Sequence, residues 1–162
     1  MAVARPACWP AFGPEPLEAR RLFAVDVVPG FAAAAFATGL DRPTAVAVAP
    51  DGRLFVTEQG GDLRVVGLDG VVAAAPVVSL TVDDRGERGL LGVTLDPAFA
   101  DYGYVYLYYT VPERILDEPA GVAPVHNRVS RFTASGDVAV AGSEKVLLDQ
   151  PALGTATNHN GG

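Results

Sequence analysis

The sequence predicts an all-β fold of short antiparallel strands, the first part of a β-propeller. Glycine and proline occupy 18 and 13 of the 162 positions, which leaves little room for long helices. From residue 31 onward, apolar residues alternate with a period of two, as in half-buried strands. A strand-and-turn unit then recurs after 47 residues, with Val46–Pro50 matching Val93–Pro97. Units of about 40 to 50 residues with four strands each are typical of propeller blades.

The first predicted blade spans about residues 44–80. Its four strands are expected at residues 44–49, 53–57, 63–66 and 71–80, with tight turns rich in glycine and aspartate between them. A separate strand is expected over residues 31–37, because Phe31 and Phe36 bracket that apolar run and Gly39 ends it.

The second predicted blade spans about residues 90–148. Its strands are expected at residues 93–97, 104–110, 127–132 and 138–148. Alternation places Tyr104, Tyr106 and Tyr108 on one face of the second strand, where packing in the core or between blades is the favoured interpretation over a sugar-stacking platform.

Two blades leave strand edges and an apolar face uncovered, so further blades are expected. A six-bladed ring at this repeat length needs roughly 300 residues. We therefore interpret residues 31–162 as the first two blades and the start of a third blade, from about residue 158, of a six-bladed β-propeller.

Charge and composition exclude some partners. The net charge is −7, carried within residues 31–162, which argues against nucleic acid. No apolar stretch approaches the roughly 18 to 20 residues of a membrane span. The single cysteine, Cys8, lies in a proline-rich leader, residues 1–30, that we expect to be disordered.

Within the leader, residues 15–23 (Glu-Pro-Leu-Glu-Ala-Arg-Arg-Leu-Phe) resemble a short N-terminal motif of large exported bacterial proteins. The resemblance implies a secreted, periplasmic or cell-surface protein. An ordinary solvated helical turn is the alternative.

The folded part resembles a known family over about residues 31–162. The segments that carry the resemblance are, in chain order, residues 36–44, 49–58, 87–93 and 159–162. The hairpin Pro-Asp-Gly-Arg-Leu-Phe-Val is common to many propellers, whereas Gly-Leu-Leu-Gly followed about seventy residues later by His-Asn-Gly-Gly is more specific. Together they resemble the glucose/sorbosone dehydrogenases, soluble quinoproteins that include aldose sugar dehydrogenases.

The resemblance implies a six-bladed propeller that holds pyrroloquinoline quinone (PQQ) over its axis with calcium beside it. It implies an enzyme that oxidises the CH–OH group of an aldose sugar or polyol and passes the electrons to an external acceptor. His159 then matches the general base that takes the anomeric proton while hydride passes to the quinone. Imidazole suits this role because it exchanges protons near neutral pH. Without the resemblance, His159 would be an exposed loop residue.

Two neighbours are candidate substrate-binding residues. Glu87 falls where sugar-oxidising members carry a glutamine that faces the substrate, although a solvated turn residue is an equal alternative. Asn158 precedes the histidine where some members have aspartate. His126 is interpreted as structural or surface-exposed. Residues that grip the quinone, and most calcium ligands, are expected in later blades, so the 162 residues alone are expected to be inactive.

Two other functions stay open for the intact protein. One is a non-catalytic binding module, as in propellers of the hedgehog-interacting type. The other is a lactonase-like hydrolase, which requires a central cluster of carboxylate and asparagine metal ligands. Basic residues in later blades would favour the dehydrogenase.

Overall fold

The computed structural model describes residues 27–115, 122–155 and 157–161. Residues 1–34 and 35–162 form two units, each considered by itself. The export-like motif at residues 15–23 and most of the predicted leader lie outside the described residues. In the first unit, residues 27–34 contain a turn in which the Phe31 amide donates to the Val28 carbonyl, 3.1 Å away.

The strand expected over residues 31–37 is wrong, because residues 31–40 have no regular secondary structure. No strand pairs with this segment in the described sheets, and the side chains of Phe31 and Phe36 are exposed. An apolar run forms a strand only where a neighbouring strand satisfies its backbone groups.

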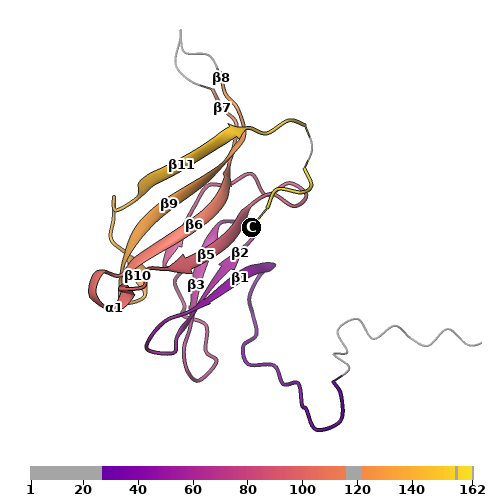
Figure 1. Ribbon diagram of the computed structural model, residues 1–162, viewed down its shortest axis with the longest axis vertical. Coiled ribbons are helices and arrows are strands. Elements are labelled where there is room, and N and C mark those ends of the chain that lie inside the picture. Colours follow the sequence, from indigo (N-terminus) through magenta and orange to yellow (C-terminus); the bar gives the residue numbers. More distant parts are fainter. Residues whose placement is uncertain (1–26, 116–121, 156, 162) are drawn as a thin grey trace, which may run out of the picture. The chain divides into compact units, whose positions relative to one another are not determined.

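The first sheet contains four antiparallel strands in chain order (Figure 1). They are β1 (Pro43–Val48), β2 (Leu54–Glu58), β3 (Asp62–Val66) and β4 (Val78–Ser79). The first three agree with the prediction. The fourth is much shorter than residues 71–80, with one isolated bridge between Val66 and Val72 before the chain bends. Pro76 explains the interruption, since proline has no backbone N–H and restricts the residue before it.

The second sheet is built mainly from β5 (Leu90–Leu95), β6 (Tyr104–Val111), β9 (His126–Ser135) and β11 (Lys145–Ala152), all antiparallel. The predicted strand at residues 138–148 is split into β10 (Val138–Ala139), which pairs with the end of β9, and β11. A turn containing Gly142 at φ +70° separates the two. The short helix α1 (Phe99–Tyr102) joins β5 to β6, and β7 (Arg114–Ile115) pairs with β8 (Val122–Ala123).

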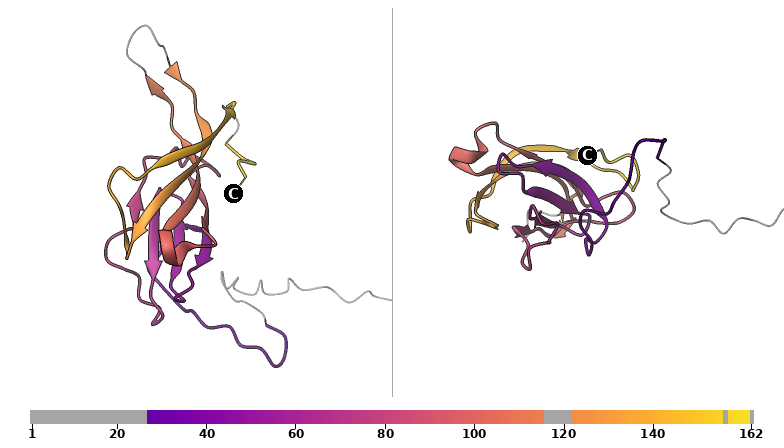
Figure 2. Two further views of the ribbon diagram at one scale, coloured as in Figure 1. Left: turned by 60° about the vertical axis from the view of Figure 1, so that its left-hand side comes forward. Right: turned by 90° about the horizontal axis from the view of Figure 1, so that it is seen from below.

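The two sheets share one hydrophobic core. β1 and β2 lie against β5, and Figure 2 shows the sheets as neighbouring layers. The core side chains are supplied by both sheets, for example Phe55 and Leu63 from the first and Val105 and Leu107 from the second. Phe55 also meets Phe99 of α1 edge to face, with ring centroids 5.4 Å apart. The predicted all-β fold of consecutive blade-like sheets is confirmed.

The tyrosines of β6 share one face, as alternation predicts. Val105, Leu107 and Tyr109 point into the core, so Tyr104, Tyr106 and Tyr108 lie on the opposite, half-buried face. The Arg131 guanidinium stacks 3.9 Å above the Tyr104 ring centre. The hydroxyls of Tyr106 and Tyr108 are both hydrogen-bonded, so these side chains have polar roles besides packing.

Loops at one end of both sheets come together. β1, β5 and β9 begin at this end, whereas β2, β6 and β11 finish there. It therefore gathers the loops at residues 59–61, 80–89 and 153–161. Figure 1 shows the yellow C-terminal segment folding back from β11 toward β2 and β5. Among the described helices, none has the length and apolar character of a membrane span.

Candidate functional site

Two of the three candidate site residues are in direct contact. The backbone amide of His159 donates to Oε2 of Glu87 at 2.7 Å, although the two residues are 72 positions apart. The Glu87 amide in turn donates to the Thr157 carbonyl at 2.8 Å. We call the two segments that meet here, residues 83–89 and 157–161, the site loops. The fold thus joins the Gly-Leu-Leu-Gly segment to the terminal His-Asn-Gly-Gly.

His159 has an unusual backbone conformation. Its φ is +57°, in the left-handed region that residues other than glycine rarely adopt. Such a conformation costs roughly 1 to 3 kcal/mol and persists where neighbouring contacts impose it. The imidazole is exposed and forms no hydrogen bond with the rest of the described chain. The side chain is therefore presented outward from a constrained backbone.

The peptide after His159 is anchored from the second sheet. The Asn160 carbonyl accepts one hydrogen bond from the Tyr108 hydroxyl at 2.6 Å and another from Nδ2 of Asn127 at 3.1 Å. Asn127 is itself fixed, because its Oδ1 accepts from Oγ1 of Thr110 at 2.8 Å. Burial raises the pKa of Tyr108, which keeps its hydroxyl protonated as a donor.

A buried ion pair anchors the first site loop. The guanidinium of Arg88 donates through Nη1 to Oδ2 of Asp83 and through Nη2 to the Gly154 carbonyl, both at 2.8 Å. The exposed guanidinium of Arg85 also donates to both carboxylate oxygens of Asp83. Hydrogen bonds from Arg85 and then Arg88 hold the pKa of Asp83 far below its usual range. Asp83 is therefore ionised at neutral pH.

The first sheet holds the same loop through Gln59. Its Nε2 donates to the carbonyls of Gly86 at 2.7 Å and Arg88 at 2.8 Å, on either side of Glu87. Its Oε1 accepts from Nη1 of Arg42 at 3.0 Å, and Nη2 of Arg42 donates to Asp84. One amide thus fixes the carbonyls of the two residues on either side of Glu87.

Gly86 allows the two site loops to approach each other. Its φ is +64°, and a Cβ at this position would lie 2.7 Å from the Thr157 carbonyl oxygen and 2.8 Å from the Thr157 Cβ. Only a residue without a side chain permits this spacing. The contact between Glu87 and His159 therefore depends on glycine at position 86.

Sequence reasoning found some of this site and missed the rest. Asn158 is exposed and adjoins His159, but forms no hydrogen bond within the described residues, so its substrate role stays a prediction. His126 contacts the Pro124 carbonyl and Asp149, in keeping with a structural role. Tyr108, Asn127 and Gln59 were not identified, since strand alternation assigns a face but not a hydrogen-bond partner.

The charged side chains of the first site loop are hydrogen-bonded within the described chain. Within the described residues, no three His, Cys, Asp or Glu side chains gather closely enough to hold a metal ion. The nearby Arg42, Arg85 and Arg88 bind Asp84 or Asp83.

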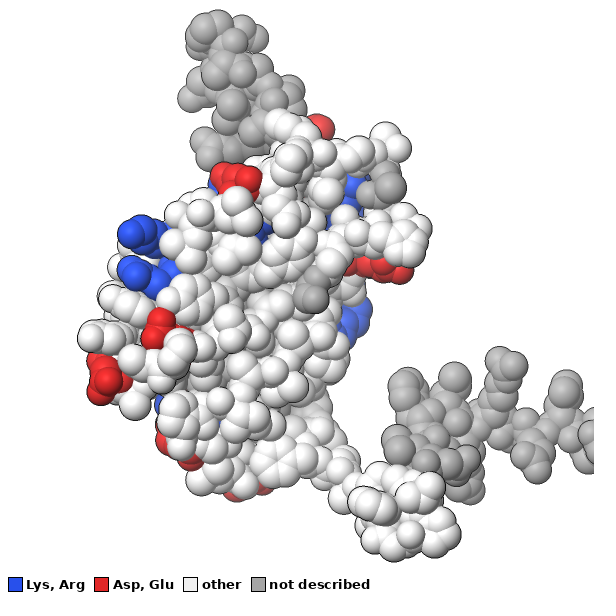
Figure 3. Space-filling model, viewed as in Figure 1, with Lys and Arg blue, Asp and Glu red and all other residues white. Residues whose placement is uncertain are grey.

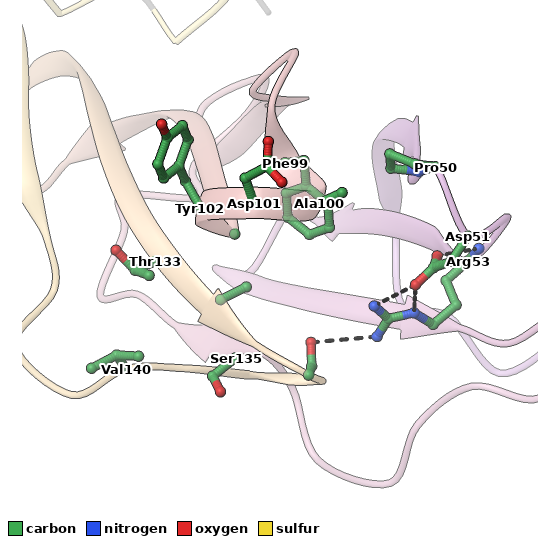
Figure 4. A pocket seen from close by; sticks show the side chains of 13 residues that line it. Pro50, Asp51, Arg53, Phe99, Ala100, Asp101, Tyr102, Thr133, Ser135 and Val140 are labelled. Carbon is green, nitrogen blue, oxygen red and sulfur yellow. Dashed lines mark hydrogen bonds and ion pairs between the residues drawn. The ribbon is translucent and has the colours of Figure 1, made fainter.

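A cavity of about 570 Å³ lies at the other end of the sheets (Figure 4). It is lined by the turn after β1, by α1 and by the end of β9. Its cation, Arg53, is hydrogen-bonded to Asp51 and Asp137. None of Glu87, Asn158 and His159 lines this cavity, so its size does not identify the candidate site.

Comparisons with known proteins place the chain among sugar dehydrogenases. Residues 40–162 match the family described as glucose/sorbosone dehydrogenase. An uncharacterized protein of Synechocystis sp. is 34% identical over 80 residues, covering 44% of this chain and 19% of that protein.

Solved structures agree with this match. The soluble aldose sugar dehydrogenase of Escherichia coli, in its apo-form, has a TM-score of 0.58 and 28% identity, covering 72% of this chain and 32% of that one. The PQQ-bound aldose sugar dehydrogenase of Streptomyces coelicolor has a TM-score of 0.58 and 26% identity, covering 75% and 34%. The chain thus spans about a third of these structures and about a fifth of the curated relative.

Proposed function

The chain belongs to the glucose/sorbosone dehydrogenase family, and we propose that it supplies the general base, His159, of a PQQ-dependent enzyme that oxidises an aldose sugar or polyol. The observation that carries this proposal is the junction of the site loops. There the backbone around His159, whose side chain is exposed, is held by Glu87 at its own amide and by Tyr108 at the next carbonyl.

The proposed reaction removes two electrons and two protons from a sugar CH–OH group. For an aldose, the anomeric hydroxyl gives its proton to the His159 imidazole while hydride leaves C1, and the product is a lactone. Transfer to a positioned base contributes about 10² to 10⁴ in rate. An exposed imidazole without a hydrogen-bond partner in the described part of the chain has a ring nitrogen available for that proton.

Glu87 and Asn158 are proposed to orient the sugar. One oxygen of Glu87, Oε2, is occupied by the His159 amide, and the second oxygen is left to accept from a sugar hydroxyl. The two roles are compatible because a carboxylate offers about four acceptor positions. The exposed amide of Asn158 offers both donors and an acceptor next to the base.

PQQ and calcium are proposed for the intact protein on the strength of the family. When bound, PQQ supplies the carbon that receives the hydride and passes the electrons to an external acceptor. The chain's own residues are assigned only to the sugar and its proton. The residues that grip the quinone and calcium are proposed to lie in later blades.

Uncovered apolar surface supports the presence of those blades. All eight residues of β11 are exposed, including the large apolar side chains of Val146, Leu147 and Leu148. Figure 3 shows a face with few charged side chains, which gather near its margins. An open edge strand with such a face normally pairs or packs with another element. We propose that further blades of the same protein cover it. Separately, the resemblance of residues 15–23 to an export motif leads us to propose that the protein acts outside the cytoplasm.

The proposal is tested with the intact protein reconstituted with PQQ and calcium. The protein should reduce an artificial dye when an aldose is added, and His159→Gln should lower kcat at least 100-fold. His126→Gln is the matched control, since it removes the chain's other imidazole from β9 and should leave kcat within about twofold. Full activity of His159→Gln would overturn the assignment of the base.

A further inference from the structure

We infer that Tyr108 and Asn127 are positioning residues for His159, acting through the carbonyl of Asn160. This inference rests on the proposed function of His159. It concerns side chains on β6 and β9 that do not touch His159 and that would not be chosen as site residues from their sequence neighbourhood.

The first step is that the His159 segment is held at two separate points. Glu87 accepts from the amide of His159 itself, 2.7 Å away. Tyr108 and Asn127 donate to the carbonyl of the next residue, Asn160, at 2.6 and 3.1 Å. The two attachments bracket the residue whose φ is +57°.

The second step is that the anchor on the sheet side is rigid. Asn127 is only 2% exposed and Asn160 only 6%. Thr110 fixes the Asn127 amide through a buried hydrogen bond, and the strands β6 and β9 pair directly at Thr110 and Asn127. The chain of contacts from Thr110 to Asn160 therefore rests on paired backbone and not on a loop.

The third step is energetic. A left-handed conformation at a non-glycine residue costs roughly 1 to 3 kcal/mol, while a single buried hydrogen bond contributes about 1 kcal/mol. The three hydrogen bonds to this segment are together of the size needed to offset the cost, so we expect the anchors on both sides to act jointly. Loss of either anchor would release His159 toward ordinary backbone conformations and so displace its imidazole.

The functional consequence is a loss of rate with little loss of binding. A general base must lie within hydrogen-bond reach of the proton that it removes. A displacement of about 1 Å can lower the rate about 100-fold. Because neither Tyr108 nor Asn127 contacts the proposed sugar-binding side chains, their removal should affect kcat much more than KM.

Tyr108→Phe provides the test, and Tyr106→Phe is its matched control. Each variant removes one phenolic hydroxyl from the same face of β6. Both hydroxyls donate a hydrogen bond of 2.6 Å, but Tyr106 donates to Asp96 and Tyr108 donates to the Asn160 carbonyl. In the intact reconstituted protein, Tyr108→Phe should lower kcat about tenfold with KM changed less than twofold. Tyr106→Phe should leave both within about twofold.

Hydrogen–deuterium exchange gives a readout independent of turnover. Without substrate, exchange in the peptide that covers residues 157–161 should be about fivefold faster in Tyr108→Phe and unchanged in Tyr106→Phe. Asn127→Ala removes the second donor and should show the same pattern, and Tyr108→Phe alone decides the question if Asn127→Ala does not fold.

The possible outcomes separate the inference from the function on which it rests. Unchanged exchange and kcat in Tyr108→Phe, with an inactive His159→Gln, would overturn the positioning role and leave the base assignment intact. Faster exchange with an active His159→Gln would overturn the base. Equal effects of Tyr106→Phe and Tyr108→Phe would show a general loss of stability and contradict the inference.

Discussion

Replacing Gly86 with alanine should lower kcat by pushing the site loops apart. The added Cβ would lie 2.7 Å from the Thr157 carbonyl oxygen and 2.8 Å from two side-chain atoms of Thr157. Thr157 would have to retreat by roughly 0.7 Å to reach ordinary van der Waals contact. Because the Glu87 amide bonds to the Thr157 carbonyl, that movement would be passed on to His159.

Gly86→Ala should affect both the stability of the protein and its kcat, and the two effects have different causes. Alanine at a positive φ costs about 1 kcal/mol of stability, and an overpacked contact adds about 1 to 3 kcal/mol. If a displacement of about 1 Å lowers a rate about 100-fold, the smaller shift expected here should lower kcat roughly 10- to 50-fold.

Gly136→Ala provides the control for backbone strain. Gly136 has φ +65°, nearly the value of Gly86, but nothing lies within 4 Å of the Cβ that alanine would add. Dye-coupled kinetics and thermal unfolding of the intact protein should show both variants destabilised, with kcat reduced only in Gly86→Ala. The same kcat in the two variants, within about twofold, would refute the link between loop spacing and the position of His159.

Two further predictions concern the anchors of residues 83–89. Asp83→Asn should lower the free energy of unfolding by about 3 kcal/mol at pH 7, because it removes the charged partner of buried Arg88. Since the pKa of Asp83 is depressed in the folded protein, its contribution is fully present above about pH 4 and declines as the pH falls further, so thermal melts of the two proteins should converge toward pH 2. The control, Asp84→Asn, removes one partner of a half-exposed ion pair and should change the free energy of unfolding by at most about 1 kcal/mol. A constant stability difference between Asp83→Asn and wild type across this pH range would contradict the depressed pKa of Asp83. Gln59→Leu should lower the free energy of unfolding by about 2 kcal/mol, because it removes the hydrogen bonds to the Gly86 and Arg88 carbonyls. Equal protection of residues 83–89 from hydrogen–deuterium exchange in variant and wild type would show that Gln59 does not hold the loop.

The fold could be predicted from the sequence where local pattern and tertiary pairing agree. Period-two alternation and turn residues identified the first three strands of the first sheet because each turn leads directly to its pairing partner. Alternation also located β5, β6 and β9 of the second sheet, but it did not predict the hairpin of β7 and β8 between β6 and β9. The same reasoning failed at residues 31–37, where an apolar run has no partner strand in the described sheets. It also overextended the fourth strand of the first sheet, where Pro76 interrupts the pairing, and it took β10 and β11 for one strand although the turn at Gly142 separates them.

The candidate site could be predicted only in part. The family resemblance named Glu87 and His159 separately as candidate site residues, and the structure joins them by a hydrogen bond that the sequence did not predict. The supporting contacts link residues that are far apart in the sequence, such as Tyr108 and Asn160 or Gln59 and Gly86. Such pairs depend on how the two sheets and the returning C-terminal segment come together, which strand alternation does not encode.

The central claim is that His159 removes the sugar's proton, and a single-turnover measurement tests it most directly. The intact protein, loaded with PQQ and calcium, is mixed anaerobically with an aldose, and the absorbance change of the quinone is followed without an external acceptor. His159→Gln should slow this change at least 100-fold while sugar affinity, measured by equilibrium binding, changes less than about threefold. The same rate in His159→Gln and wild type would contradict the claim.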